Sequence, residues 1–405
     1  MPKAFTVKYV CVLACVLALA TPLLAQKLKV GEVRGYRSET PHPYPQGNAS
    51  RPAVWEEHVT SAGATFLRVH FVGLHLADGD YLTVSSPDGA QSWTYAGRGP
   101  HGNGDVWAFA IDGDEAIVRI HGGTRAGHGY QIDAVGHGTV EINARGGPFA
   151  PTPEVVCGTD GREHIACYIG NDPEGQKIDA NQRAVARLQW VSGAFLFACT
   201  GSLVRGNGID NMLMTNNHCI NTQGETSALQ ATFNFQKSAC NGAGDEPTTD
   251  YAGGTFLKAN SGLDYSLLTL QGSPEATWGE LVPTTQQPAV GDTIWFIQHG
   301  GGNEKKIGYW EDSAQTVRCK VDSIDVTVSS AKRNTQTTYG CDSEGGSSGS
   351  PITRTTDGKI VALHHFGGVS GSPCLNSGTE MVSICANATT GSKKNPTPLL
   401  SCDSN

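Results

Sequence analysis

The sequence has no apolar run after residue 25 that approaches the roughly 18 residues of a membrane span. It also lacks an excess of basic residues, because 29 Lys and Arg face 38 Asp and Glu, a net charge of −9. The 51 glycines follow no three-residue period, which excludes a collagen-like chain. We therefore expect no membrane contact and no nucleic-acid binding, and instead a turn-rich β protein of about two or three domains.

One short apolar run lies at the start of the chain, over 9–24. It follows Lys3 and Lys8 and ends before the small residue Ala25. A positive start, a short apolar stretch and a small residue at its end are typical of a secretory signal peptide. The sequence predicts that 1–25 is cleaved off near Ala25 and that the protein is secreted to the extracellular space.

Cysteine is missing from a long part of the chain. Of 12 cysteines, Cys11 and Cys15 lie in the predicted signal peptide and the other ten follow residue 156. An even number in an exported protein indicates disulfides, and no CxxC pair or zinc-like spacing is present. The change in cysteine use coincides with a Pro- and Gly-rich linker at 143–153. We predict two units, residues 26–145 and 146–405.

Both units read as β-rich. Residues 64–72 alternate, with Leu67, Val69 and Phe71 on one face and Arg68 and His70 on the other, as in a half-buried strand. Short strands separated by turn residues predict an antiparallel β-sandwich for the first unit. The second unit has similar short strands, and residues 178–186 are its one modest helix candidate. The predicted fold class is all-β.

Three motifs in the second unit carry the chemistry. His218 directly follows an apolar strand, Asp264 directly precedes another, and Ser348 lies in the glycine-rich loop 345–349. Each motif alone is weak evidence for catalysis, because a lone His, a lone Asp or a Ser-containing loop is usually structural. Together they suit acyl transfer: His can deprotonate a serine, a carboxylate orients the imidazole, and loop N–H groups can stabilise an oxyanion.

These motifs resemble those of secreted trypsin-like serine endopeptidases, especially the bacterial lysyl and glutamyl branches. The resemblance covers about 155–400 and rests on the segments 198–204, 215–219 and 346–351. It implies two six-stranded antiparallel barrels with the site between them. It also implies that His218 is the base, Asp264 the orienting acid and Ser348 the nucleophile, with the N–H groups of Gly346 and Ser348 as the oxyanion hole.

The resemblance also implies a disulfide pattern and a precursor. Six cysteines match the lysyl-type framework, which leaves the other four to pair with each other by elimination. The expected pairs are Cys157–Cys374, Cys167–Cys240, Cys199–Cys219, Cys319–Cys341 and Cys385–Cys402. Residue 347 is Ser where many trypsin-like enzymes have Asp, so activation through a new N-terminal amine is not expected.

Segments 63–71 and 99–107 of the first unit resemble, more weakly, the β-rich pro-region of secreted bacterial serine proteases. As a pro-region, the unit would be an intramolecular inhibitor or a folding chaperone, and Arg145 in the linker would be a basic processing site. As a permanent module, it would bind a substrate, a wall or a partner. The sequence leaves both possibilities open.

The sequence also leaves two alternatives for the specificity pocket. Asp342 and Ser343 lie where a trypsin-type pocket has its floor, and Glu380 lies where lysyl enzymes have a pocket acid, so we favour cleavage after basic residues. The alternative is glutamyl specificity through His365, since 364–368 is similar to a glutamyl-branch segment that includes Gly367. Asp342 would repel an acidic substrate.

The sequence thus predicts a serine endopeptidase of protein or peptide substrates that needs no cofactor and no metal. The histidines show no HxxxH or HxH spacing that would indicate a metal site. The alternative from another functional class is a catalytically silent secreted binding protein on the same fold, against which the intact trio argues.

Overall fold

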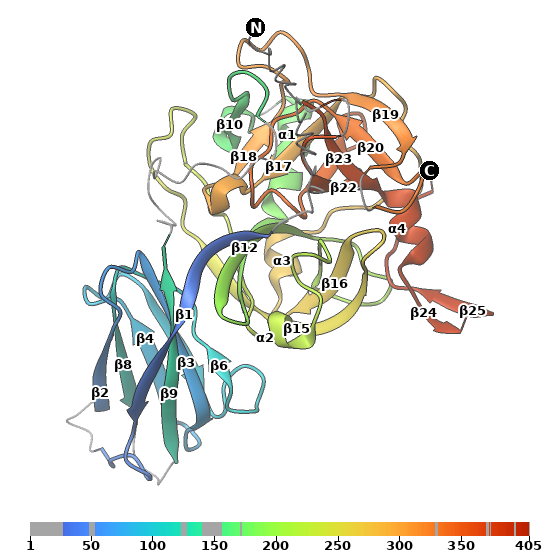
Figure 1. The fold of residues 1–405 in the computed structure, drawn as a ribbon. Coiled ribbons are helices and arrows are strands. Elements are labelled where there is room, and N and C mark those ends of the chain that lie inside the picture. The colour runs from blue at the N-terminus through green and yellow to red at the C-terminus, as the bar shows by residue number, and fades with distance from the viewer. Residues whose placement is uncertain are drawn as a thin grey trace, which may run out of the picture.

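The computed structural model describes residues 27–47, 53–122, 128–139, 156–170, 172–328, 331–369, 372, 374–392 and 394–404. The predicted signal peptide and the predicted linker, with Arg145, lie outside these residues. Two β-rich bodies lie side by side, a sandwich coloured blue to teal and a larger body coloured green to red (Figure 1). No helix in the described ranges is long and apolar enough to cross a membrane.

The smaller body is an antiparallel β-sandwich, as predicted. Its two layers enclose an apolar core that includes Leu67, Phe71 and Val118. One layer contains β1 (Leu28–Glu39), β9 (Gly129–Gly138), β3 (Phe66–His75), β6 (Val106–Trp107) and β7 (Ile111–Asp112); the other contains β2 (Ala53–Thr60), β8 (Glu115–His121), β4 (Tyr81–Ser85) and β5 (Ser92–Ala96).

Strand β3 differs from its prediction in one respect. Leu67, Val69 and Phe71 are buried in the sandwich core as expected, but Arg68 on the opposite face is also fully buried. Its guanidinium donates to the carbonyls of Ala108 and Trp107 and, across the boundary between the two bodies, to that of Gln189. The second face of β3 is therefore covered by the larger body rather than by solvent.

The first barrel of the larger body is closed. Its strands follow the order β11, β14, β15, β16, β13, β12 and return to β11, all antiparallel. The bounds are β11 Val185–Ser192, β12 Phe195–Leu203, β13 Met212–Thr215, β14 Gln230–Phe233, β15 Thr249–Asn260 and β16 Tyr265–Leu270.

The second barrel is closed less completely. Its sheet order is β10, β18, β17, β21, β22, β23, β20, β19, and the Ile294 N–H donates to the carbonyl of Cys319 to bring the β19 end back to β17. The bounds are β10 Arg162–His164, β17 Ile294–Gln298, β18 Lys306–Gly308, β19 Val321–Val326, β20 Gln336–Tyr339, β21 Pro351–Arg354, β22 Ile360–Phe366 and β23 Asn376–Glu380. The predicted all-β class, a sandwich followed by a double barrel, is confirmed.

Short helices and one small hairpin complete the larger body. The helix expected at 178–186 is α1, Pro173–Arg183, which begins earlier because the Asp172 side chain accepts from the N–H groups of Glu174 and Gly175 and Pro173 starts the first turn. The others are α2 Gln223–Ser227, α3 Pro274–Trp278, α4 Met381–Asn387, the 3₁₀ turns Ile165–Cys167 and Gly300–Gly302, and the hairpin β24 Thr389–Ser392 with β25 Asn395–Pro398.

The larger body contains five disulfides, between the same partners that the resemblance implies. They are Cys157–Cys374, Cys167–Cys240, Cys199–Cys219, Cys319–Cys341 and Cys385–Cys402. They join strands and loops within this body alone, so the sandwich has no covalent cross-link to it among the described residues.

Strand β1 joins the two bodies. It pairs antiparallel with β9 of the sandwich and, at its N-terminal end, with β12 of the first barrel. Beneath it lies a shared apolar cluster in which Val30 and Phe66 of the sandwich pack with Leu196 and Phe235 of the barrel. Figure 1 shows β1 rising from the sandwich and reaching over to β12. The predicted units are thus connected by a continuous sheet as well as by the chain.

Candidate active site

His218 and Asp264 come together because the strands before and after them are neighbours. β13 ends at Thr215, shortly before His218, and β16 begins directly after Asp264. These strands pair antiparallel with Thr215 opposite Ser266, so the end of one lies at the start of the other. The Asn216 side chain donates to the Asp264 carbonyl at 2.7 Å and ties the two turns to each other.

Both oxygens of Asp264 bind His218. Oδ1 accepts from the His218 backbone N–H at 2.9 Å, and Oδ2 lies 2.7 Å from the ring Nδ1. Burial alone would raise the pKa of Asp264, but the charge and hydrogen bonds of His218 and His365 hold this pKa well below its usual range. An ionised carboxylate on Nδ1 favours the tautomer in which Nε2 can accept a proton.

Ser348 lies in the loop that precedes β21, and strand β12 holds this loop. The Thr200 N–H donates to the Ser348 carbonyl at 2.9 Å, and the Thr200 hydroxyl donates to the Gly346 carbonyl at 2.9 Å. Gly346 has φ +99°, a conformation that favours glycine. The nucleophile loop is therefore fixed from the side of the first barrel.

Two peptide groups of this loop have defined directions. The Gly345 carbonyl accepts from Gly301 N–H at 2.7 Å, and the Ser347 carbonyl accepts from Ser350 N–H at 3.1 Å. In a trans peptide the N–H points opposite to the C=O, so the N–H groups of Gly346 and Ser348 point away from these two donors.

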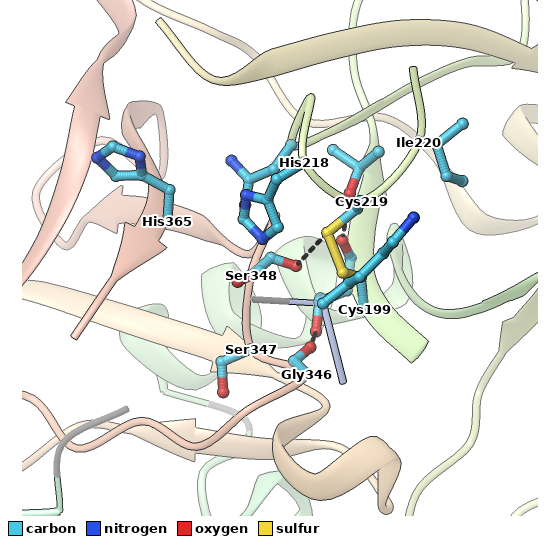
Figure 2. Close-up of a disulfide and its surroundings, with 12 residues drawn as sticks. Cys199, His218, Cys219, Ile220, Gly346, Ser347, Ser348 and His365 are labelled. Carbon is cyan, nitrogen blue, oxygen red and sulfur yellow. Dashed lines mark hydrogen bonds between the residues drawn. A yellow bond between two sulfur atoms is a disulfide. The ribbon is translucent and has the colours of Figure 1, made fainter. Parts of the chain in front are cut away.

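Figure 2 shows the His218 ring next to Ser348, and Sγ of the adjoining Cys219 lies 4.0 Å from the Ser348 carbonyl oxygen. The His218 Nε2 is buried and has no hydrogen-bond partner within the described part of the chain. The Cys199–Cys219 disulfide lies on the far side of Ser348 from His365 in the same view. The structure thus brings the three predicted residues together at the boundary between the barrels.

The family of the chain follows from its sequence. Residues 159–392, more than half of the chain, match the model of the lysyl endopeptidase C-terminal domain. The chain belongs to this lysyl endopeptidase family. The predicted likeness to trypsin-like serine endopeptidases is thereby confirmed, and the larger body is a peptidase domain.

Other known proteins resemble the chain more distantly. A Plasmopara viticola protein named Secreted RxLR effector protein 73 is 28% identical over 353 residues, which span 82% of this chain and 83% of that protein. A solved Glu endopeptidase in complex with MPD is 18% identical, covers 57% of this chain and 96% of that one, and has a TM-score of 0.40. The active form of the Rv3671c protease from M. tuberculosis is 15% identical, with coverages of 58% and 89% and a TM-score of 0.39.

The two residues predicted for the pocket floor have different partners. Asp342 is fully buried, and its two oxygens accept from the backbone N–H groups of Cys157, at 3.0 Å, and Gly161, at 2.7 Å. Burial raises the pKa of Asp342. Ser343 donates to Asn376 Oδ1 at 2.9 Å. Asn376, which the sequence reasoning missed, is thus a neutral polar neighbour of Ser343, and nothing in its own motif marked it.

Among the described residues, no side-chain hydrogen bond joins Glu380 or Gly367 to Asp342, Ser343 or Asn376. Glu380 lies at the other end of β23 from Asn376, about 13 Å away for a strand that rises roughly 3.3 Å per residue. Its Oε1 accepts from Asp325 N–H at 2.8 Å. Gly367 directly follows β22 and is half-buried. Glu380 therefore bonds to β19, at the opposite end of β23 from the Asn376–Ser343 contact.

His365, the residue of the alternative glutamyl pocket, has two partners within the protein. It is fully buried, with Nδ1 3.2 Å from Asp264 Oδ2 and Nε2 2.5 Å from Gln336 Oε1. Both ring nitrogens are thus taken up by protein partners, and burial lowers the pKa of His365. The ring lies against the orienting acid of the trio, and Gln336 is a second residue that sequence reasoning missed.

Ser347, which stands in place of the usual acid, has a structural partner. It is fully buried and its hydroxyl donates to Gln298 Oε1 at 2.5 Å. It also accepts from Glu344 N–H at 3.2 Å. A neutral residue with these bonds has no carboxylate to offer to a new terminal amine.

Two other features of the described residues lie outside this chemistry. The one group with metal-ligand geometry, Cys199, His218 and Cys219, has its two sulfur atoms joined in a disulfide, so it does not suit a metal. A cavity of about 350 Å³ between the sandwich and the first barrel is lined by Tyr95 and Asp250, among others, and by no residue of the trio.

Proposed function

We propose that the chain is a serine endopeptidase that works through an acyl-enzyme. His218 Nε2 takes the proton of the Ser348 hydroxyl as Oγ attacks the peptide carbonyl carbon. The resulting oxyanion accepts hydrogen bonds from the N–H groups of Gly346 and Ser348, and the His218 imidazolium then protonates the leaving amine. Water repeats the sequence on the acyl-enzyme and releases Ser348.

One observation carries this proposal: Asp264 holds His218 with both of its oxygens while Nε2 is left unpaired beside the nucleophile loop. The ionised Asp264 stabilises the imidazolium that forms when Nε2 takes a proton. Thr200 supports the same arrangement, since its two hydrogen bonds fix the carbonyls of Gly346 and Ser348.

We further propose that this peptidase cleaves after basic residues and that Asp342 is the pocket acid. Its buried carboxylate accepts from neutral N–H groups, so a substrate cation would supply the opposite charge that burial demands. Ser343 and Asn376 would be the neutral acceptors beside it. A glutamyl pocket is disfavoured because both ring nitrogens of His365 are already engaged.

Secretion completes the proposed function. Five disulfides require an oxidising compartment, and the related effector protein is named as secreted. The protein would therefore meet its protein or peptide substrates outside the cell that makes it.

The deciding experiment compares secreted wild type with Ser348→Ala on a denatured protein mixture, with new termini identified by mass spectrometry. We expect cuts after Arg or Lys that are absent from the variant. Cuts after Glu would overturn the basic specificity. Equal termini in both samples, with Ser348 also unlabelled by a fluorophosphonate, would leave a secreted binding protein.

A matched pair of variants tests the pocket acid. Asp342→Asn should lower kcat/KM after basic residues by about 100-fold or more, because a charge-assisted contact is lost in a desolvated pocket. Glu380→Gln changes another buried acid that accepts a backbone N–H and should leave this preference intact. The reverse result would move the pocket to Glu380.

A further inference from the structure

Strand β12 presents an edge of the first barrel close to the nucleophile loop. Over its N-terminal half this edge is paired by β1, with Leu28 opposite Ala198 and Lys29 opposite Phe197. Without β1, residues 195–198 would offer unpaired N–H and C=O groups, which is how extended peptides bind to a sheet by strand addition.

The paired end of β1 reaches the loop that would stabilise the oxyanion. Ala198 precedes Cys199 and Thr200, and Thr200 holds the carbonyls of Gly346 and Ser348. The Leu28 side chain lies so close that a Cβ added to Gly346 would be 3.3 Å from Leu28 Cδ2. A Cβ added to Gly302 would likewise lie 3.7 Å from Leu28 Cδ2.

This edge lies opposite the predicted pocket. Ser343 and Asn376 belong to the second barrel, whereas β12 belongs to the first, and the nucleophile loop lies between them. When the side chain of the acyl half of a substrate enters the pocket, the leaving amine half therefore lies on the side of β12. A peptide that extends past the cleaved bond needs the space and the backbone groups that β1 now uses.

We propose that β1 is a built-in occupant of the leaving-group side of the cleft, so that the chain restricts its own access to extended substrates. This inference rests on the proposed peptidase function and adds the element that regulates it. The sandwich acts through this strand: whatever draws β1 off β12 opens the site. Small reagents that modify Ser348, such as a fluorophosphonate, have nothing to place on β12 and reach Ser348 in either state.

A side-chain lock holds the start of β1. Lys27 Nζ lies 3.3 Å from Glu225 Oε1 and 3.4 Å from Ser192 Oγ, and 4.3 Å above the Phe197 ring. Glu225 is held in turn by Ser192 at 2.7 Å and by Asn221 N–H at 2.8 Å. The ladder itself is short, four residue pairs with an irregularity between Lys29 and Gly31, so the strand is held locally and can be displaced.

The experiment removes this occupant and compares two reactions of Ser348. One variant deletes 27–32, the part of β1 on β12; a second, Leu28→Asp, places a charge against Gly346 and keeps the chain length. Glu39→Ala, at the exposed opposite end of β1, is the control. Each protein is assayed for fluorophosphonate labelling of Ser348 and for digestion of denatured casein per labelled site.

We expect casein digestion to rise by about 10-fold or more in both variants, since the apparent affinity scales with the open fraction of the site. Labelling rates and the Glu39→Ala control should stay near wild type. Unchanged casein digestion, or an equal rise in casein digestion and labelling, would overturn the inference. Failure of the proposed function gives a different result, namely no labelling of Ser348 in any protein.

Discussion

The two bodies of this protein are stabilised in different ways. The peptidase body has all five described disulfides and the three residues of the proposed chemistry. The sandwich has an apolar core of its own, but it is joined to its neighbour by strand pairing, a shared apolar cluster and the buried Arg68. The larger body is thus covalently cross-linked, which keeps its geometry, while the smaller is docked on it by contacts that can be broken.

The strongest loss of activity should come from a change in the peptidase body. Asp264→Asn should lower kcat/KM by about 10⁴-fold, because an amide on His218 Nδ1 favours the wrong tautomer and cannot stabilise the imidazolium. Hydrolysis of a peptide with a basic residue before the cut measures it. Asp105→Asn, an exposed acid of the sandwich that contacts His70, is the control and should match wild type. Equal losses of kcat/KM in both variants would contradict the assignment of the chemistry to the peptidase body alone.

The docking of the sandwich predicts the next effect. Arg68→Met should lower the free energy of unfolding by roughly 2–4 kcal/mol, because the carbonyls of Ala108, Trp107 and Gln189 lose a buried donor. Urea unfolding followed by tryptophan fluorescence measures it. Arg37→Met, an exposed position on β1, should change little. If both variants were equally stable, the contact across the boundary would have no energetic weight.

Two disulfides of the peptidase body close loops of similar length but lie at different distances from the site. Replacing Cys199 and Cys219 by serine should cost about 3 kcal/mol, and replacing Cys385 and Cys402 about the same, since their separations are 20 and 17 residues. Thermal unfolding compares these costs. Only the first pair adjoins His218, so casein digestion by the folded protein should fall in that variant alone. Hydrogen exchange in the sandwich should be unaltered in both.

The last prediction concerns pH. Lys305 is fully buried, and burial lowers its pKa to about 7. The unfolded chain therefore binds more protons above that value, so stability should rise with pH from about 7 to 10, by at most ~1.4 kcal/mol per pH unit. Lys305→Met should flatten this part of the urea-unfolding profile, whereas Lys306→Met, at the neighbouring partly exposed position, should keep it. An unchanged slope in Lys305→Met would show that another group titrates.

Much of this could be predicted from the sequence where the signal is local. His218 and Asp264 each flank an apolar strand, and the alternation of Leu67, Val69 and Phe71 marked the sandwich core correctly. What could not be predicted depends on partners distant in the chain. Burial of Arg68 needs the barrel to cover its face, because the strand pattern alone cannot say what lies on the polar side.

The details of the site show the same limit. Sequence reasoning offered His365 by its motif as an alternative pocket residue, but could not foresee its contact with Asp264, which spans 101 residues and depends on how the two barrels meet. Asn376 becomes a neighbour of Ser343 only through the pairing of β20 and β23. Residue type and spacing identify the groups that do chemistry more readily than the residues that position them.

The place of β1 in the sheet has a consequence for how the chain folds. It is synthesised before both of its neighbours, yet Leu28 pairs with Ala198, 170 positions later in the chain. Closing so long a loop is entropically costly and slow, so this pairing should form late. Until then the edge of the first barrel stays open, and a newly made molecule passes through a stage in which another extended chain can compete for the place of its own first strand.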